Sequence, residues 1–360
     1  MNTNRTSRFR LHLFLVCLFA VATVGFLYAE NQKPLDEVIS EIAAARRQNP
    51  HAGFDRQEIV RNYGAKAVVT QARSLVQDPN HAVRDFGYTL LTDAGMASGD
   101  SAVRQMVVDL KVSGIGDKEE SISTAHVNGL LIGFQKREDY SDQAKDTLRR
   151  YFDVIMETGS RDQFSHDIIL LIGVADIQEE MGRLQTIIDQ VEGPLNPFRT
   201  SANTRQQAMA ASQHKLAFSA LRAKARMGDE EAIRRCISLV ESEADEDFKV
   251  EILLDRLSYV RQPAVVDYIK QFLYSDKSRD VDPLSHVIVL PYSYRAVLCF
   301  EKMIVGFPER AVIANHIMRY GFDNQFREKW PTYATEGTYM AHVRYCRQWL
   351  EAQSKIELIR

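Results

Sequence analysis

Arginine side chains recur on the segments of this chain that are best suited to bind an anionic group. They lie beside the apolar faces of several predicted helices, at Arg104, Arg149, Arg150, Arg183, Arg234 and Arg235. Guanidinium groups gathered on one concave surface would form a ladder of positive charge. The candidate partner-binding arginines are therefore Arg104, Arg150, Arg183 and Arg234.

A second interpretation of the same arginines is structural. An acidic residue stands four positions before most of them, in the pairs Asp100/Arg104, Asp146/Arg150, Glu179/Arg183, Glu230/Arg234 and Glu231/Arg235. Opposite charges at this spacing share one helix face, and each pair stabilises its helix by about 0.2–0.5 kcal/mol. The spacing favours solvated helix faces over a ligand groove.

Aromatic residues form the second set of candidates. Phe198 follows Pro194 and Pro197 in a loop that interrupts the repeats described below, and further aromatic residues cluster near the C-terminus at Phe322, Phe326, Trp330, Tyr333 and Tyr339. Such side chains can bind a peptide or a glycan, which makes Phe198, Phe326, Trp330 and Tyr333 candidate partner-binding residues. The alternative for the C-terminal cluster is a cap, completed by a final helix from Thr338 to Leu358.

No residue pattern predicts catalysis, a cofactor or a metal site. The GxSxG, HExxH, P-loop and GxGxxG motifs do not occur in the sequence. Asp276, Asp280 and Asp282 have a spacing reminiscent of calcium loops, but the glycine and the distal glutamate of an EF-hand are missing. We therefore expect no catalytic residue, no cofactor and no metal ion.

The cysteines that follow the N-terminal segment show no metal-ligand spacing. Cys236 and Cys299 lie within apolar helical runs, and Cys346 is distant from both. An exported chain could join two of them in a disulfide. The apolar surroundings favour buried, unreactive thiols instead.

The elements that must position these residues are predicted by an apolar triplet with i, i+4, i+7 spacing. It occurs as Val103/Val107/Leu110, Leu148/Phe152/Ile155, Leu184/Ile188/Val191, Ile233/Ile237/Val240, Val265/Ile269/Phe272 and Ile313/Ile317/Tyr320. The triplets begin about 42 residues apart on average, which is the length of two short helices with their turns. Asp100, Asp229 and Pro263 occupy helix-start positions. The sequence therefore predicts stacked helical hairpins, preceded by an amphipathic helix from Leu35 to Arg47 and a helical pair split at Gly64.

Two stretches of this pattern resemble a known family. The run D-P-x-x-x-V-R at 78–84 and the turn A-R-M-G-D-E-E-A-I-R at 225–234 are similar to bacterial HEAT repeats. The resemblance, which extends roughly over residues 55–321, implies an all-α fold, an α-α superhelix of about six to seven helical hairpins. It also implies that the second helix of each hairpin lines a concave face for a partner. We expect a capping helix and linker at 30–54, the solenoid at 55–321 and an aromatic C-terminal cap helix at 322–360.

The N-terminus predicts export. Arg5, Arg8 and Arg10 precede residues 11–29, which contain no Asp, Glu, Lys or Arg, as in a signal peptide. Cleavage could follow Ala22 or Ala29, and an uncut segment at residues 1–29 would anchor the chain in the inner membrane with the body outside the cytoplasm. Removing the three arginines changes the formal net charge from −3 to −6, which argues against nucleic-acid binding.

Two hypotheses for function follow. The first is an exported, non-catalytic HEAT-like scaffold that mediates protein–protein interaction in the periplasm, at the cell envelope or outside the cell. The alternative is a secreted α/α-toroid polysaccharide lyase or hydrolase, in which His286, Tyr292 or Tyr294 would meet a carboxylate in a deep pocket. The sequence identifies neither the partner protein nor the oligomeric state.

Overall fold

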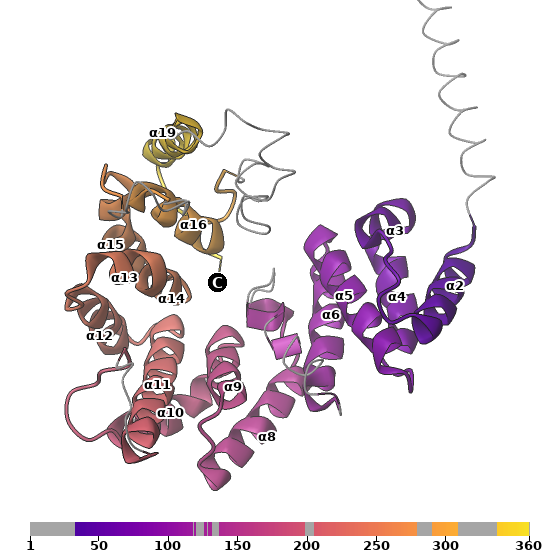
Figure 1. The fold of residues 1–360 in the computed structure, drawn as a ribbon, viewed down its shortest axis with the longest axis horizontal. Coiled ribbons are helices and arrows are strands. Elements are labelled where there is room, and N and C mark those ends of the chain that lie inside the picture. Colours follow the sequence, from indigo (N-terminus) through magenta and orange to yellow (C-terminus); the bar gives the residue numbers. More distant parts are fainter. Residues whose placement is uncertain are drawn as a thin grey trace, which may run out of the picture. The chain divides into compact units, whose positions relative to one another are not determined.

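The computed structural model describes residues 33–117, 119, 126–127, 129–131, 137–198, 205–278, 290–308 and 337–359. In these segments the chain is helical, and extended pairing among them is limited to an isolated bridge between Ile304 and Leu358. The helices form two compact units, Met1–Gly99 and Asp100–Arg360 (Figure 1). The predicted all-α class is confirmed, whereas the boundaries expected at 54 and 321 remain predictions.

The first unit contains the helices α2 (Leu35–Gln48), α3 (Arg56–Tyr63), α4 (Ala65–Leu75) and α5 (His81–Ala97). Gly64, with φ of 80°, separates α3 from α4, and the Asn80 side chain caps α5 by accepting hydrogen bonds from two backbone N–H groups. The predicted helix near Leu35 and the split at Gly64 are therefore confirmed.

The second unit holds the remaining described α-helices. They are α6 (Ser101–Ser113), α8 (Asp142–Thr158), α9 (Gln163–Val174), α10 (Met181–Asp189), α11 (Arg205–Arg226), α12 (Glu230–Glu241), α13 (Glu246–Phe248), α14 (Leu254–Ser258), α15 (Pro263–Leu273), α16 (Tyr292–Met303) and α19 (Gly337–Ala352). Asp100 and Asp229 accept hydrogen bonds from the backbone N–H groups of Ala102 and Ala232, and Pro263 begins α15. The expected helix starts are confirmed, because the two aspartates cap free N–H groups and proline is tolerated in the first turn, where its missing N–H needs no partner.

Five of the six apolar triplets fall on helices of this unit, namely α6, α8, α10, α12 and α15, although Val191 of the third triplet lies just beyond the end of α10. Their buried members include Val107, Leu148, Leu184, Val240 and Ile269, none of which exposes more than a trace of its surface. The i, i+4, i+7 spacing thus marks the core-facing side of each helix, as expected from 3.6 residues per turn. The sixth triplet, which begins at Ile313, lies outside the described residues.

Helices that follow one another in sequence also pack together in the second unit. Helix α9 contacts α8 and α11, α11 contacts α10 and α12, and α15 contacts α12, α14 and α16 (Figure 1). The helical pairs α9/α10, α11/α12 and α14/α15 are connected by turns at 175–180, 227–229 and 259–262. A continuous apolar cluster runs through these helices and fills the space between them.

The C-terminal helix is shorter than the sequence predicts. Helix α19 ends at Ala352 rather than at Leu358. Beyond it, the backbone N–H of Val305 donates to the Glu357 carbonyl at 2.9 Å, and that of Ile359 donates to the Met303 carbonyl at 2.8 Å. The last residues therefore satisfy the backbone groups that follow α16, which a continued helix could not do.

None of the described helices is both long and apolar enough to cross a lipid bilayer. The segment at 11–29, on which the expectation of export rests, lies outside the described residues.

Candidate functional site

Arg104 is held inside the second unit by an ion pair. Its Nε lies 3.1 Å and 3.0 Å from the two carboxylate oxygens of Asp139, whose side chain has no exposed surface. A buried carboxylate requires such a partner because its desolvation is costly. The guanidinium of Arg104 thus contacts the protein's own core.

Arg183 and Arg149 connect neighbouring helices. Arg183 Nη1 lies 2.8 Å from Asp153 on α8 and 2.9 Å from Glu180, and the guanidinium stands 4.7 Å from the ring centroid of Phe152. Arg149 on α8 pairs with Glu179 at 3.1 Å. The predicted pair Glu179/Arg183 is therefore wrong, because Glu179 pairs with Arg149 on α8, while Arg183 pairs with Asp153 on α8 and with Glu180.

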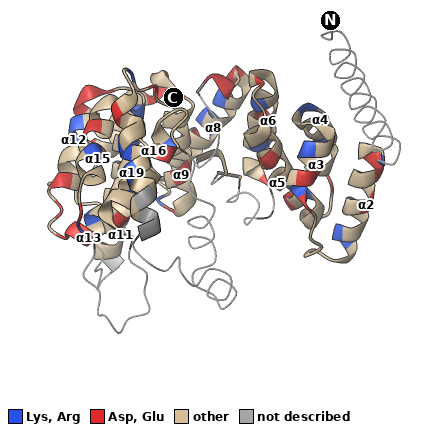
Figure 2. Ribbon diagram, turned by 90° about the horizontal axis from the view of Figure 1, so that it is seen from above, with Lys and Arg blue, Asp and Glu red and all other residues tan. Residues whose placement is uncertain are grey.

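Arg150 and Arg234 remain closer to solvent. Arg150 donates to Thr147 at 3.0 Å, while its predicted partner Asp146 pairs with Arg149 instead. Arg234 is exposed on α12 and forms no ion pair with Glu230 in the part of the chain that the structure describes. Acidic and basic residues are interspersed over the helices of this unit (Figure 2), so these arginines do not form a uniform cationic face.

Of the four aromatic candidates, the structure describes only Phe198. Phe198 is half-buried, with its ring 5.5 Å from that of Phe218 and 6.0 Å from that of Phe248 in edge-to-face geometry. Its contacts are therefore with the core of its own unit. Phe326, Trp330 and Tyr333 lie outside the described residues.

The cysteines are free thiols, and Cys236, Cys299 and Cys346 are all buried, as their apolar surroundings predict. No cluster of metal-ligating side chains is found within the described ranges, although Asp280 and Asp282 lie outside them. Burial raises the pKa of each thiol to about 12, so all three are protonated at neutral pH.

Of the residues required by the enzymatic alternative, the structure describes only the two tyrosines, and both are buried. Tyr292 and Tyr294 are buried in α16, and the Tyr292 hydroxyl donates to Asp247 at 2.5 Å. His286 lies outside the described residues.

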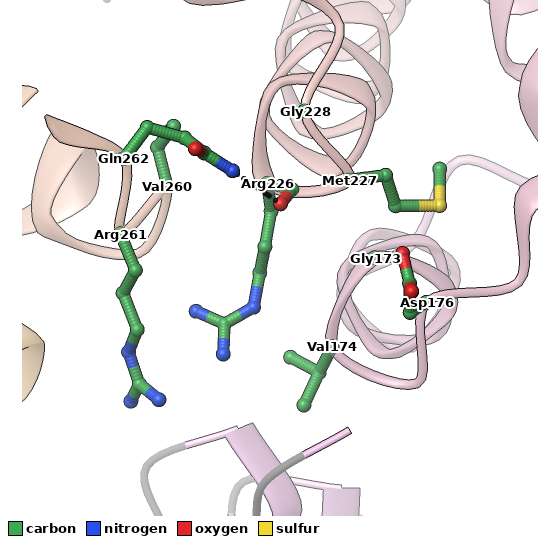
Figure 3. Close-up of a pocket in the computed structure, with 9 residues that line it drawn as sticks. All are labelled: Gly173, Val174, Asp176, Arg226, Met227, Gly228, Val260, Arg261 and Gln262. Carbon is green, nitrogen blue, oxygen red and sulfur yellow. Dashed lines mark hydrogen bonds between the residues drawn. The ribbon is translucent and has the colours of Figure 1, made fainter. Parts of the chain in front are cut away.

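A cavity of about 130 Å³ lies where the turns of three successive helical pairs meet. It is lined by Gly173, Val174, Asp176, Arg226, Met227, Gly228, Val260, Arg261 and Gln262 (Figure 3). The Gln178 side chain donates to the Met227 carbonyl at 3.1 Å, and the Gln262 side chain donates to the Arg226 carbonyl at 2.9 Å. These hydrogen bonds tie the three turns together.

Each of the three turns contains a residue in the left-handed region of backbone conformation. The φ angles are 54° at Asp176, 98° at Gly228 and 51° at Arg261. This conformation is ordinary for glycine but uncommon for a residue as long as arginine. At Arg261 it is maintained by the packing of the surrounding turns.

Two guanidinium groups dominate the charge of the cavity. Arg226 and Arg261 extend on the same side of the turns (Figure 3), and neither forms an ion pair with a carboxylate among the described residues. Arg261 is only 8% exposed. Burial, together with the charge of Arg226, lowers the pKa of Arg261 to about 9, and burial also lowers the pKa of Arg226.

Other contacts of the two arginines are with neutral groups. Arg226 donates to the Tyr259 carbonyl at 2.5 Å and stands 5.1 Å from the Tyr259 ring centroid, while Arg261 donates to the Ile359 carbonyl at 3.3 Å. Asp176 also lines the cavity, and its carboxylate accepts a hydrogen bond from Gln178 at 2.7 Å. Two positive charges therefore stand against one negative charge in the cavity wall.

Sequence reasoning did not select Arg226 or Arg261. Arg226 belongs to the turn that resembles a HEAT repeat, and Arg261 stands two positions before Pro263. Their meeting depends on how consecutive turns stack, which no local spacing encodes. The local signal that sets them apart is that neither has an acidic residue four positions before it. The four candidate arginines each have one, namely Arg104, Arg150, Arg183 and Arg234.

The first unit contains a separate cavity of about 550 Å³, lined by Gln57, Val60, Arg61, Gly64, Ala65, Asp93, Met96 and Ala97. Met96, which is 66% exposed, lies at its edge. Asp93 is bound by Arg56 at 2.7 Å, so the carboxylate in the wall of this cavity is already neutralised.

No model of a known protein family matches the sequence, and a search of curated proteins returned no match. The proposals below therefore depend on the residues and the geometry of this chain.

Proposed function

We propose that this chain is an exported, non-catalytic scaffold of HEAT-like helical hairpins that binds a partner protein in the periplasm, at the cell envelope or outside the cell. The observation that supports this most is the cavity formed by three consecutive turns in the second unit. Helical repeat proteins bind partners over surfaces to which several repeats contribute, because each repeat alone presents only a small area.

The position of this cavity moves the proposed binding surface from the second helices to the turns. Arg104 and Arg183, which were expected on a concave binding face, are engaged with acidic residues of their own unit. The turn residues Met227 and Gln262 instead border open space while tied to neighbouring turns. A partner group bound there would contact several hairpins at once.

Site-specific photocrosslinking tests this proposal. A photoreactive amino acid is introduced at Met227, which borders the cavity, or at exposed Ser238 on α12 as the control, in the full chain expressed in its native cells. We expect a discrete crosslinked adduct of defined mass from position 227 and none from position 238. Absence of an adduct at 227, or the same adducts at both positions, would contradict the proposal.

Whether the chain is exported from the cytoplasm is tested separately by protease accessibility. Protease is added to cells whose outer layer has been permeabilised while the inner membrane stays intact. The chain should then be digested, while a cytoplasmic marker protein survives. Protection of the chain alongside that marker would place it in the cytoplasm and refute the exported scaffold.

A further inference from the structure

We propose that the cavity formed by Arg226 and Arg261 binds a small oxyanionic group, a carboxylate or a phosphate, carried by the partner of this scaffold. This inference rests on the proposed function, since it names the chemistry that the turns would recognise. The charge balance of the cavity, the shape of its hydrogen-bond donors and the buried hydroxyl of Tyr140 all favour an oxyanion.

The wall of the cavity carries a net positive charge, because it contains Arg226 and Arg261 but only one acidic residue, Asp176. Burial and the charge of Arg226 lower the pKa of Arg261, and Arg261 has almost no contact with solvent that could screen its charge. A buried charge without a counterion destabilises a folded protein unless something of opposite sign occupies the site. Asp176 offsets one of the two charges, which leaves one positive charge for an external anion.

The donor geometry fits an oxyanion. A guanidinium presents several N–H groups in a planar fork that matches the spacing of carboxylate or phosphate oxygens. The described contacts of Arg226 and Arg261 engage one nitrogen of each with a backbone carbonyl, so further N–H groups remain on each fork. The cavity volume of about 130 Å³ corresponds to roughly four water molecules, which is enough for a single oxyanionic group.

Tyr140 carries a buried hydroxyl within electrostatic range of both arginines, although it is not one of the residues that line the cavity. It is only 4% exposed, and its hydroxyl oxygen has no hydrogen-bond partner among the described residues. Burial raises the pKa of this hydroxyl, while the charges of Arg226 and Arg261 act to lower it. An unsatisfied buried hydroxyl costs free energy, and an anion could accept its hydrogen bond.

The test is anion binding by the purified full chain, measured by isothermal titration calorimetry and by the rise of the unfolding temperature. Inorganic phosphate and acetate are the probes, and chloride at equal ionic strength is the reference. We expect saturable binding of at least one probe, and preference for acetate or for phosphate identifies the group that the partner carries. Binding of neither would overturn the inference.

Variants locate the binding. Arg261→Met and Arg226→Met should each weaken the affinity about tenfold or more, because a charge-assisted hydrogen-bond donor is lost. Arg344→Met, which removes an exposed arginine on α19, should leave the affinity unchanged. Equal affinity of the wild-type and Arg261→Met proteins would overturn the inference.

Two further readouts separate binding from a purely structural role. Arg261→Met should raise the unfolding temperature of the anion-free protein, because it removes an uncompensated buried charge. Tyr140→Phe should weaken anion binding severalfold without lowering that temperature, since its hydroxyl makes no hydrogen bond in the described part of the chain. Destabilisation of the anion-free protein by Arg261→Met would indicate a structural arginine and contradict the proposal.

The two proposals can fail independently. If phosphate and acetate do not bind but position 227 still crosslinks to a partner, the scaffold proposal is supported and the anion site is refuted. If an anion binds at the arginines but no crosslink forms, the cavity binds a free anion, and both the scaffold proposal and the assignment of the anion to its partner are refuted.

Discussion

Asp167 and His166 are adjacent on α9, and burial disfavours the charged form of each. Burial raises the pKa of Asp167 from 3.8 to about 6 and lowers that of His166 from 6.5 to about 4, with the charge of Arg222 adding to the latter effect. Between pH 4 and 6 the folded state therefore binds more protons at Asp167 than the unfolded state does, and fewer at His166. Stability conferred by Asp167 falls as the pH rises through this window, whereas stability conferred by His166 increases.

Asp167→Asn separates these opposing effects. Asparagine keeps a side-chain oxygen that can accept the hydrogen bond from Gln163, now at 2.7 Å, but carries no charge. Relative to wild type, the variant should gain about 2–3 kcal/mol in free energy of unfolding at pH 7 and little at pH 4. Denaturant unfolding across this pH range, with exposed Asp267→Asn as the control, measures the difference, and a pH-independent difference would refute the argument.

At the scale of helices, the close packing of α9 against α11 holds two of the three turns in place. A Cβ atom added to Gly173 would lie 2.8 Å from the Ala223 Cα and 3.0 Å from its Cβ. These contacts are with the backbone and first side-chain atom of α11, so neither can move without shifting the helix. The absence of a side chain at Gly173 thus lets the helices approach closely enough to form one wall of the cavity.

Gly173→Ala should therefore destabilise the second unit by about 1–3 kcal/mol, because the two helices must separate. Gly182→Ala is the matched control, since a Cβ there meets no atom within 4 Å and Gly182 lies in α10. That change should stabilise the protein by about 0.5–1 kcal/mol through helix propensity. Thermal unfolding of both variants measures the two changes in stability. Equal changes would show that the close approach of α9 and α11 at Gly173 does not determine the stability of the unit.

At the scale of the whole molecule, the sequence predicts the helices better than it predicts the site. The apolar triplets identify buried helix faces because burial follows the 3.6-residue period, and Asp100 and Asp229 identify helix starts because their side chains cap free N–H groups. Both signals are local. They do not determine the path of the stacked hairpins, so the superhelix remains part of the proposal.

The site could not be predicted because it consists of residues far apart in sequence. Arg226 and Arg261 resemble any solvated arginine until neighbouring turns bring them together, and the same packing redirects Arg183 from Glu179 to Asp153. Nor does the composition of 261–263 predict a left-handed conformation at an arginine. Charge partners across helices are properties of packing, whereas spacing along one helix describes only that helix.

The central claim is that three consecutive turns form one anion-binding surface. Hydrogen exchange of the full chain, followed by mass spectrometry with phosphate, acetate or chloride at equal ionic strength, tests it most directly. We predict that the bound anion slows exchange in peptides covering all three turns, at 175–180, 227–229 and 259–262, and leaves α12 near Ser238 unchanged. Protection confined to one turn, or absent from all three, would contradict the account.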